Sequence, residues 1–180
     1  RFTVGTSNTT DLPFIHPSSL DTGWSGTNIV PFAFDFNMLD PGRDTYYLLI
    51  ALHDSHERVP SNMVLTMNGT VFGKQKMPVG VGKAFSGDMS GSPFILTVPV
   101  SNTLLRTGKN ELVITLHDGS WVTYDAICLL DMGQLKHLAD LPRMPVLKSF
   151  NSFTVNSFKT ENSLVFPTAD GIYAVSGREY

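Results

Sequence analysis

The alternation of apolar and polar positions predicts an all-β chain. In residues 29–39, Phe32, Phe34 and Phe36 occupy every second position, with Asp35 between two of them. Successive side chains of a strand point to opposite faces, so the three rings share one face and Asp35 lies on the other. This pattern predicts a strand with one face in an apolar core.

Further strands follow, separated by clusters of turn residues. Residues 45–54 (TYYLLIALHD) form a mostly apolar run rich in β-formers, which is typical of a strand buried on both faces. Residues 62–73 contain Asn68-Gly69 between apolar flanks, the strongest short-range signal for a hairpin. The Gly-rich residues 77–93 predict a long loop. Further strands are expected in residues 94–100, 112–116 and 121–130.

The pattern changes at Gly133. Residues 1–132 predict a jelly-roll β-sandwich of about eight strands, because short strands recur at even spacing with little helical periodicity. Residues 133–180 are interrupted by prolines and polar stretches, and predict an irregular extension that packs on the sandwich or on a partner domain. Within the extension, residues 163–177 have the pattern of one β-hairpin.

Composition narrows the classes of partner. The chain has 180 residues, a formal net charge of -3 and only 16% charged residues, so no broad electrostatic attraction to nucleic acid or anionic membrane is expected. No run of about 18 apolar residues predicts a membrane span. The single cysteine, Cys128, excludes an intrachain disulfide and is expected to be a small core residue. Sequons at Asn8 and Asn68 favour a secreted glycoprotein.

Three segments resemble a known module. They are FTVGTSNTTDLPFIHP (residues 2–17), YYLLIALHDSHERVPSNMVLTMNG (46–69) and LLRTGKNELVITLHDGSWVTYDAICL (104–129). Together they resemble the C-terminal, carbohydrate-binding-like domain of rhamnogalacturonan lyases, a galactose-binding-like jelly roll. The last segment carries most of the likeness, through G-x-N-x-L-x-I-x-L followed by Y-D-x-I-x-L. The resemblance covers about residues 2–131, and the tail after Asp131 has no counterpart in it.

The resemblance implies a secreted module attached to a catalytic domain that degrades acidic pectic glycans. Candidate sugar-binding residues on this interpretation are Trp24, Trp121, Tyr124, Arg58 and Lys83. Aromatic faces stack on the apolar C–H patches of sugar rings, and a Trp in the Gly/Ser-rich segment DTGWSGT is a plausible platform. Packing against the sandwich core is the alternative for each aromatic residue, and the strand context of Trp121 favours packing.

A second interpretation places catalysis in this chain. The segment LHDSHERVP holds His53, His56 and Arg58 within six residues. A lyase acting on uronic acids needs a cation for the carboxylate, a base for a carbon-bound proton and an acid for the leaving oxygen, and these residue types can serve all three roles. A solvated loop at a strand end is the alternative, and a third interpretation makes the chain a structural docking domain without a ligand.

Metal ligation is the last candidate chemistry. Two closely spaced histidines without a third ligand do not predict a zinc site. A structural calcium ion is possible, because carboxylate and carbonyl oxygens hold calcium in many sandwich domains. The first candidates are Asp125 and Asp11, and the wider set of oxygen donors adds Asp21, Asp54 and Asp118. The pair Tyr124-Asp125 is interpreted as structural, with Tyr124 and Asp125 on opposite faces of the closing strand.

Overall fold

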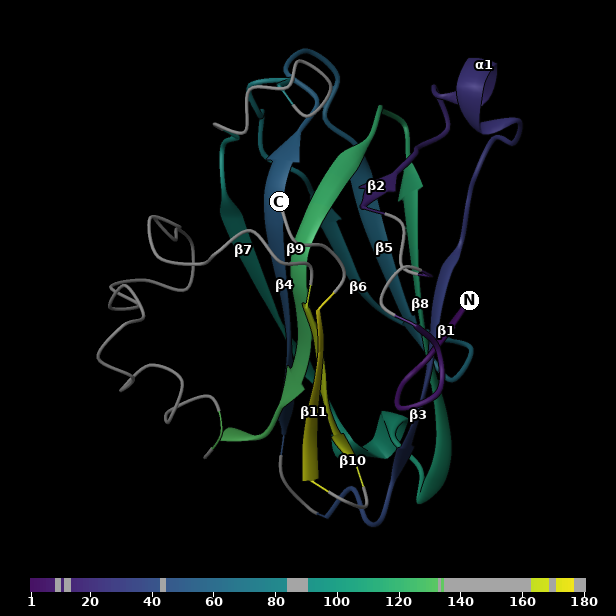
Figure 1. The fold of residues 1–180 in the computed structure, drawn as a ribbon, viewed down its shortest axis with the longest axis vertical. Coiled ribbons are helices and arrows are strands. Elements are labelled where there is room, and N and C mark those ends of the chain that lie inside the picture. Colours follow the sequence, from purple (N-terminus) through teal and green to yellow (C-terminus); the bar gives the residue numbers. More distant parts are fainter. Residues whose placement is uncertain are drawn as a thin grey trace.

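The computed structural model describes residues 1–8, 11, 14–42, 45–83, 91–132 and 134, and the backbone of 163–168 and 171–176. Its strands form two sheets that face each other (Figure 1). Sheet A has the order β1 (Phe2–Thr3), β3 (Phe32–Met38), β8 (Gly108–His117), β5 (Asn62–Met67) and β6 (Thr70–Lys76). Sheet B has the order β11 (Gly171–Ser176), β10 (Ser163–Thr168), β9 (Val122–Leu130), β4 (Tyr46–Ser55) and β7 (Phe94–Val100), and β2 (Ile15–His16) also pairs with β9.

The predicted all-β sandwich is confirmed. The helical elements among the described residues are α1 (Thr22–Ser25) and the short 3-10 helix η2 (Asn102–Leu104). From β3 to β9 the chain passes to the other sheet at every connection except the β5–β6 hairpin, as in a jelly roll. The predicted Asn-Gly turn makes that hairpin, with Asn68 at φ 50 and Gly69 at φ 85.

The main core fills the space between the sheets. On sheet A the buried residues recur at every second position, such as Met63, Leu65 and Met67 of β5. They belong to the same core cluster as Leu48, Ile50 and Leu52 of β4, which are at most 1% exposed. The alternation in β3 predicted Phe32, Phe34 and Phe36 as core residues, and all three are buried. Burial of apolar area on these faces stabilises the sandwich at about 25 cal/mol per Å².

The central strands of sheet B, β4 and β9, are buried on both of their faces. The outer face of its central strands carries a second apolar cluster, with Leu49, Ala51 and Tyr47 on β4. The expectation that β4 would be buried on both sides is therefore confirmed, and β9 behaves in the same way. The remaining members of the cluster are Ile95, Ala126, Cys128 and Leu130.

Two bulges interrupt the pairing of β4 with β9. Ala51 lies opposite Ala126 and Leu52 opposite Tyr124, so Asp125 is an extra residue in β9. Leu52 and Asp54 then lie opposite consecutive residues of β9, which makes His53 an extra residue in β4. The two bulges compensate each other and restore the original register. Bulges redirect side chains locally, and here they set the polar His53 and Asp125 in an otherwise apolar pair of strands.

The end of the chain continues sheet B. The backbone of β10 runs parallel to β9, and β11 pairs with β10 in an antiparallel hairpin. The remainder of the predicted extension lies outside the described residues. Among the residues with a described structure, no helix is long and apolar enough to cross a membrane.

Candidate functional site

Four loops meet at one end of the sandwich, at the top of Figure 1. They follow β2, β4, β6 and β8, and the first of them contains α1. The described loop residues are 17–31, 56–61, 77–83 with 91–93, and 118–121. Loops held by a rigid scaffold are the usual place for ligand contacts, so this loop end is the first candidate for a functional surface.

Hydrogen bonds fix the loop of α1 to the loop between β8 and β9. The buried Asp21 carboxylate accepts from the Ser120 hydroxyl at 2.6 Å and from the Ser18 amide at 2.8 Å. The Leu20 amide donates to the Gly119 carbonyl at 3.1 Å. These contacts join segments about a hundred residues apart and place α1 on the scaffold.

Asp54 fixes the Gly-rich loop in a similar way. Its fully buried carboxylate accepts from the backbone amides of Ser55, Val81 and Lys83, each at 2.9 Å. Gly80 packs so closely that a Cβ there would overlap the Ser55 carbonyl oxygen. The residue type at Gly80 is thus dictated by the approach of the loop to the end of β4.

Six large apolar side chains in these loops are exposed, and together they are called the apolar rim. Trp24 in α1 is 54% exposed and is the predicted stacking residue that the structure places at the surface. Five more exposed large apolar side chains lie in the same loops. They are Leu20, Ile29, Val59, Val79 and Val81. Clustered exposed apolar side chains mark interaction surfaces more often than scattered ones do.

The other predicted sugar-binding residues do not gather around Trp24. Trp121 is 5% exposed and Tyr124 is 1% exposed, so neither ring face is open to a sugar in this conformation. Arg58 is exposed and forms a 3.2 Å ion pair with Glu57. Lys83 is half-buried, and its backbone is held by Asp54.

Tyr124 has a structural partner in the buried His16. Nδ1 of His16 lies 2.7 Å from the Tyr124 hydroxyl, and Nε2 lies 2.7 Å from the Val30 carbonyl oxygen. The Val30 oxygen can only accept, so Nε2 carries the proton and Nδ1 accepts from Tyr124. Burial lowers the pKa of His16 to about 3 and raises the pKa of Tyr124 well above its usual value. The neutral ring stacks on Phe32 with centroids 3.7 Å apart.

One of the three predicted catalytic residues, His56, closes a turn of the local backbone. Nδ1 of His56 accepts from the amides of Arg58 and Val59 at 3.1 and 3.2 Å, which closes the turn after β4. His53 is buried at the bulge beside Phe14, and burial lowers its pKa while the neighbouring Asp54 carboxylate opposes that shift. His53 is therefore buried at the bulge, whereas His56 and Arg58 lie in the turn after β4, where Arg58 is exposed.

The carboxylates proposed for calcium are dispersed. Among the described residues, no group of three or more His, Cys, Asp or Glu side chains could hold a metal ion. Asp11 is exposed and accepts from the Asn8 amide, whereas Asp125 is buried in β9. Asp21 and Asp54 already accept from the hydroxyl and amide groups given above. Backbone and hydroxyl donors therefore occupy oxygens that calcium would need.

The two sequons differ in their surroundings. Asn8 is exposed. Nδ2 of Asn68 donates to the Leu104 carbonyl and to Asn110 Oδ1, both at 2.8 Å. A glycan on Nδ2 of Asn68 would remove at least one of these bonds, so Asn8 is the sequon whose geometry suits modification.

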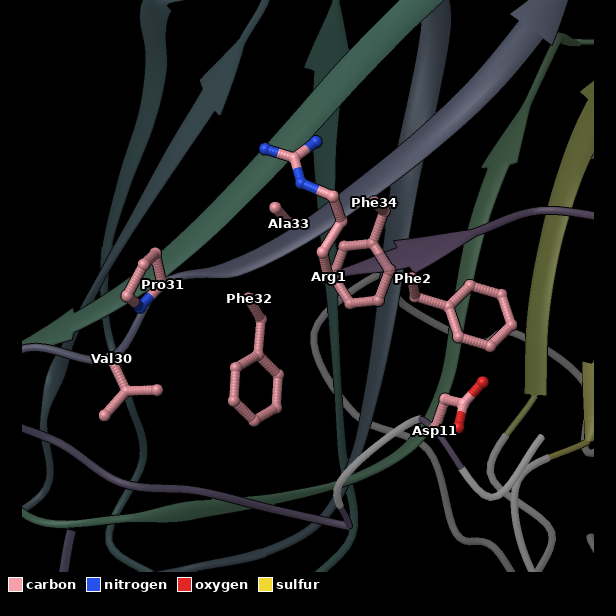
Figure 2. A pocket seen from close by; sticks show the side chains of 8 residues that line it. All are labelled: Arg1, Phe2, Asp11, Val30, Pro31, Phe32, Ala33 and Phe34. Carbon is pink, nitrogen blue, oxygen red and sulfur yellow. The ribbon is translucent and has the colours of Figure 1, made fainter. Parts of the chain in front are cut away.

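Sequence patterns did not single out an apolar hollow beside β3. Figure 2 shows the rings of Phe2, Phe32 and Phe34 along it, with Val30 and Pro31 at one side. Its volume is about 170 Å³, and Arg1 and Asp11 contribute its charged groups. The Arg1 guanidinium is bound by Asp35 at 2.6 Å and Glu111 at 2.7 Å. The alternating phenylalanines were the available signal, but alternation alone predicts a filled core.

Comparisons with known proteins find likeness among solved structures. No protein-family model matches the chain, and no curated protein matches it. A family 35 carbohydrate-binding module from an environmental isolate has 12% identity and a TM-score of 0.42, covering 58% of this chain and 67% of that chain. The insecticidal delta-endotoxin Cry8Ea1 from Bacillus thuringiensis has 15% identity and a TM-score of 0.44, covering 64% of this chain and 22% of that chain.

A third solved structure is a glucuronidase. It is a family GH115 4-O-methyl-alpha-glucuronidase with specificity for decorated arabinogalactans, at 12% identity and a TM-score of 0.36. The match covers 69% of this chain and 17% of that chain. The chain thus spans about a fifth of the endotoxin and of the glucuronidase. Identities and TM-scores of this size assign no family.

Proposed function

We propose that the chain is a carbohydrate-binding module that holds a glycan at the loop end through Trp24. The exposed Trp24 ring is the observation that carries this proposal. A stacking platform must be both accessible and rigidly held, and the Asp21–Ser120 hydrogen bond anchors the segment that leads into α1. The sequence resemblance supports the more specific proposal of a secreted, non-catalytic module of a rhamnogalacturonan lyase-like enzyme acting on acidic pectic glycans.

Calorimetric titration with rhamnogalacturonan, oligogalacturonate and a neutral oligosaccharide tests the proposal. We expect binding to at least one of them, and an affinity about tenfold lower in Trp24→Ala, since loss of about 1.4 kcal/mol is a factor of ten. Leu39→Ala is the matched control. Leu39 is also an exposed large apolar residue, but it follows β3 at the opposite end of the sandwich. Equal affinities for wild type and Trp24→Ala would remove Trp24 from the site.

A second candidate function follows from the same apolar rim. The six side chains of the rim also suit docking against another protein domain, as in the structural interpretation of the sequence. Analytical ultracentrifugation separates the two candidates. Docking would be favoured if the wild type self-associates, binds no glycan, and becomes monomeric in the double variant Leu20→Ser/Val59→Ser. A monomer that binds glycan would favour the module.

A further inference from the structure

Three rows of side chains cross the outer face of sheet A. On β5 the residues Met63, Leu65 and Met67 are fully buried, so the alternate residues of this strand face outward. The register of β8, β5 and β6 then aligns their outward side chains. The rows are His117–Asn62–Lys76, Thr115–Val64–Lys74 and Val113–Thr66–Val71.

A groove of about 520 Å³ lies over this face. Val64 and the exposed Val71 give it an aliphatic floor. Asn62 and His117 supply an amide and an imidazole group to it. Neighbouring strands are about 4.8 Å apart, so the rows span about 10 Å from β8 to β6. A groove with a small apolar floor and polar sides suits a ligand that presents both C–H and hydroxyl groups, which is the chemistry of a sugar.

The charge of the groove differs in sign from that of the chain. Lys74 and Lys76 stand two residues apart on the same face of β6. Nζ of Lys76 donates to the Pro60 carbonyl at 2.5 Å, whereas Lys74 makes no hydrogen bond or ion pair with any described residue. Asp118 is the opposing charge, and Asn62 Nδ2 lies 3.5 Å from its Oδ2. Two ammonium groups against one carboxylate leave the groove positive in a chain of net charge -3.

We propose that this groove is a second glycan site, which recognises an acidic sugar through Lys74 and Lys76. The inference rests on the proposed function in that the ligand is a glycan, but it uses a surface of sheet A that does not include Trp24. A uronic-acid carboxylate would accept from the two ammonium groups, while the sugar ring lies over Val64. The residues that line the groove include no Phe, Tyr or Trp, the large rings on which nucleobases usually stack, which favours a glycan over a nucleic acid.

The probes are oligogalacturonate and its methyl ester, which have the same sugar rings with and without charge. We expect the wild type to bind the acid at least tenfold more tightly than the ester, with a preference that shrinks as salt rises. Lys74→Glu should abolish the preference, and Lys74→Gln should reduce it. Lys109→Glu is the matched control, because Lys109 is an exposed lysine of β8 outside the groove, and it should keep the preference.

The outcomes separate this proposal from the Trp24 site. Retention of the acid preference in Trp24→Ala, with its loss in Lys74→Glu, supports the groove. Glycan binding that depends on Trp24 but not on Lys74 overturns the groove and leaves the loop-end site intact. Absence of all glycan binding overturns both. Binding of a sulfated oligosaccharide in place of the carboxylated one would identify sulfate as the anion. Binding of a DNA oligonucleotide instead of a glycan, if it depends on Lys74, would overturn the proposal.

Discussion

The outer faces of the two sheets have opposite characters. On sheet A the strand β5, and β8 from Asn110 onward, alternate between buried and partly exposed residues, and the outward ones include Asn62, Thr115 and His117. On sheet B the strands β4 and β9 are buried on both faces, and the outer face carries Leu49 and the rest of the second apolar cluster. The outer face of sheet A is therefore polar and partly exposed, whereas the outer face of the central strands of sheet B is apolar and buried.

We expect the two outer faces to differ in role, one in binding and the other in stability. A face of amides, lysines and threonines costs little to leave in water and can exchange water for a ligand. An apolar face stabilises the fold only while it remains covered. Substitutions on the outer face of sheet A should therefore change recognition, and those on the outer face of sheet B should change the free energy of unfolding.

The largest expected effect is on the packing of sheet B. Leu49→Ala should lower the free energy of unfolding by about 2–5 kcal/mol, because it removes buried methyl groups and leaves a cavity. Val64→Ala is the matched change on the outer face of sheet A and should cost less than about 1 kcal/mol. Urea unfolding of both variants measures the difference. Equal costs would show that the two faces are covered to the same degree.

The buried His16 extends the comparison to pH. The pKa of His16 is about 3 in the folded chain and 6.5 in the unfolded chain, so the unfolded chain binds the proton more readily. The stability that neutral His16 contributes is complete above pH 6.5 and is lost as the pH falls toward 3. The slope contributed by one such group is about 1.4 kcal/mol per pH unit at most.

Urea unfolding between pH 7 and 4 tests this expectation. His16→Gln should flatten the pH dependence, because glutamine can donate to Val30 and accept from Tyr124 without titrating. Asn62→Gln, on the outer face of sheet A, should keep the slope of the wild type, because it changes no titratable group. The interpretation of His16 fails if the two variants have the same pH dependence.

The sequence predicted much of this fold because alternation is local. The phenylalanines of β3, the doubly buried β4 and the Asn68-Gly69 turn could all be recognised from adjacent residues. Residue types in those segments agree with their position in the sheet, so the pattern and the structure coincide.

The site could not be predicted in the same way, because its contacts join distant segments. Asp21 meets Ser120 and His16 meets Tyr124 across about a hundred residues, and no spacing in the sequence predicts either pair. The groove of sheet A depends on register, which sets Lys74, Val64 and Thr115 in one row across β6, β5 and β8. A shift of one residue would turn these side chains to the core, so the composition of β6 alone does not predict them as neighbours.

The smallest expected effect comes from one hydroxyl. Tyr124→Phe keeps the ring in the core but leaves Nδ1 of the buried His16 without its donor, and this should cost about 1–3 kcal/mol in urea unfolding. Tyr47→Phe, at a partly exposed position on the outer face of sheet B, should stay within about 0.5 kcal/mol of the wild type. In the His16→Ala background the cost of Tyr124→Phe should fall, because the acceptor is gone. A cost that stays unchanged in that background would mean that the Tyr124 hydroxyl acts through another contact, and the pair would no longer explain why this tyrosine lies inside the sandwich.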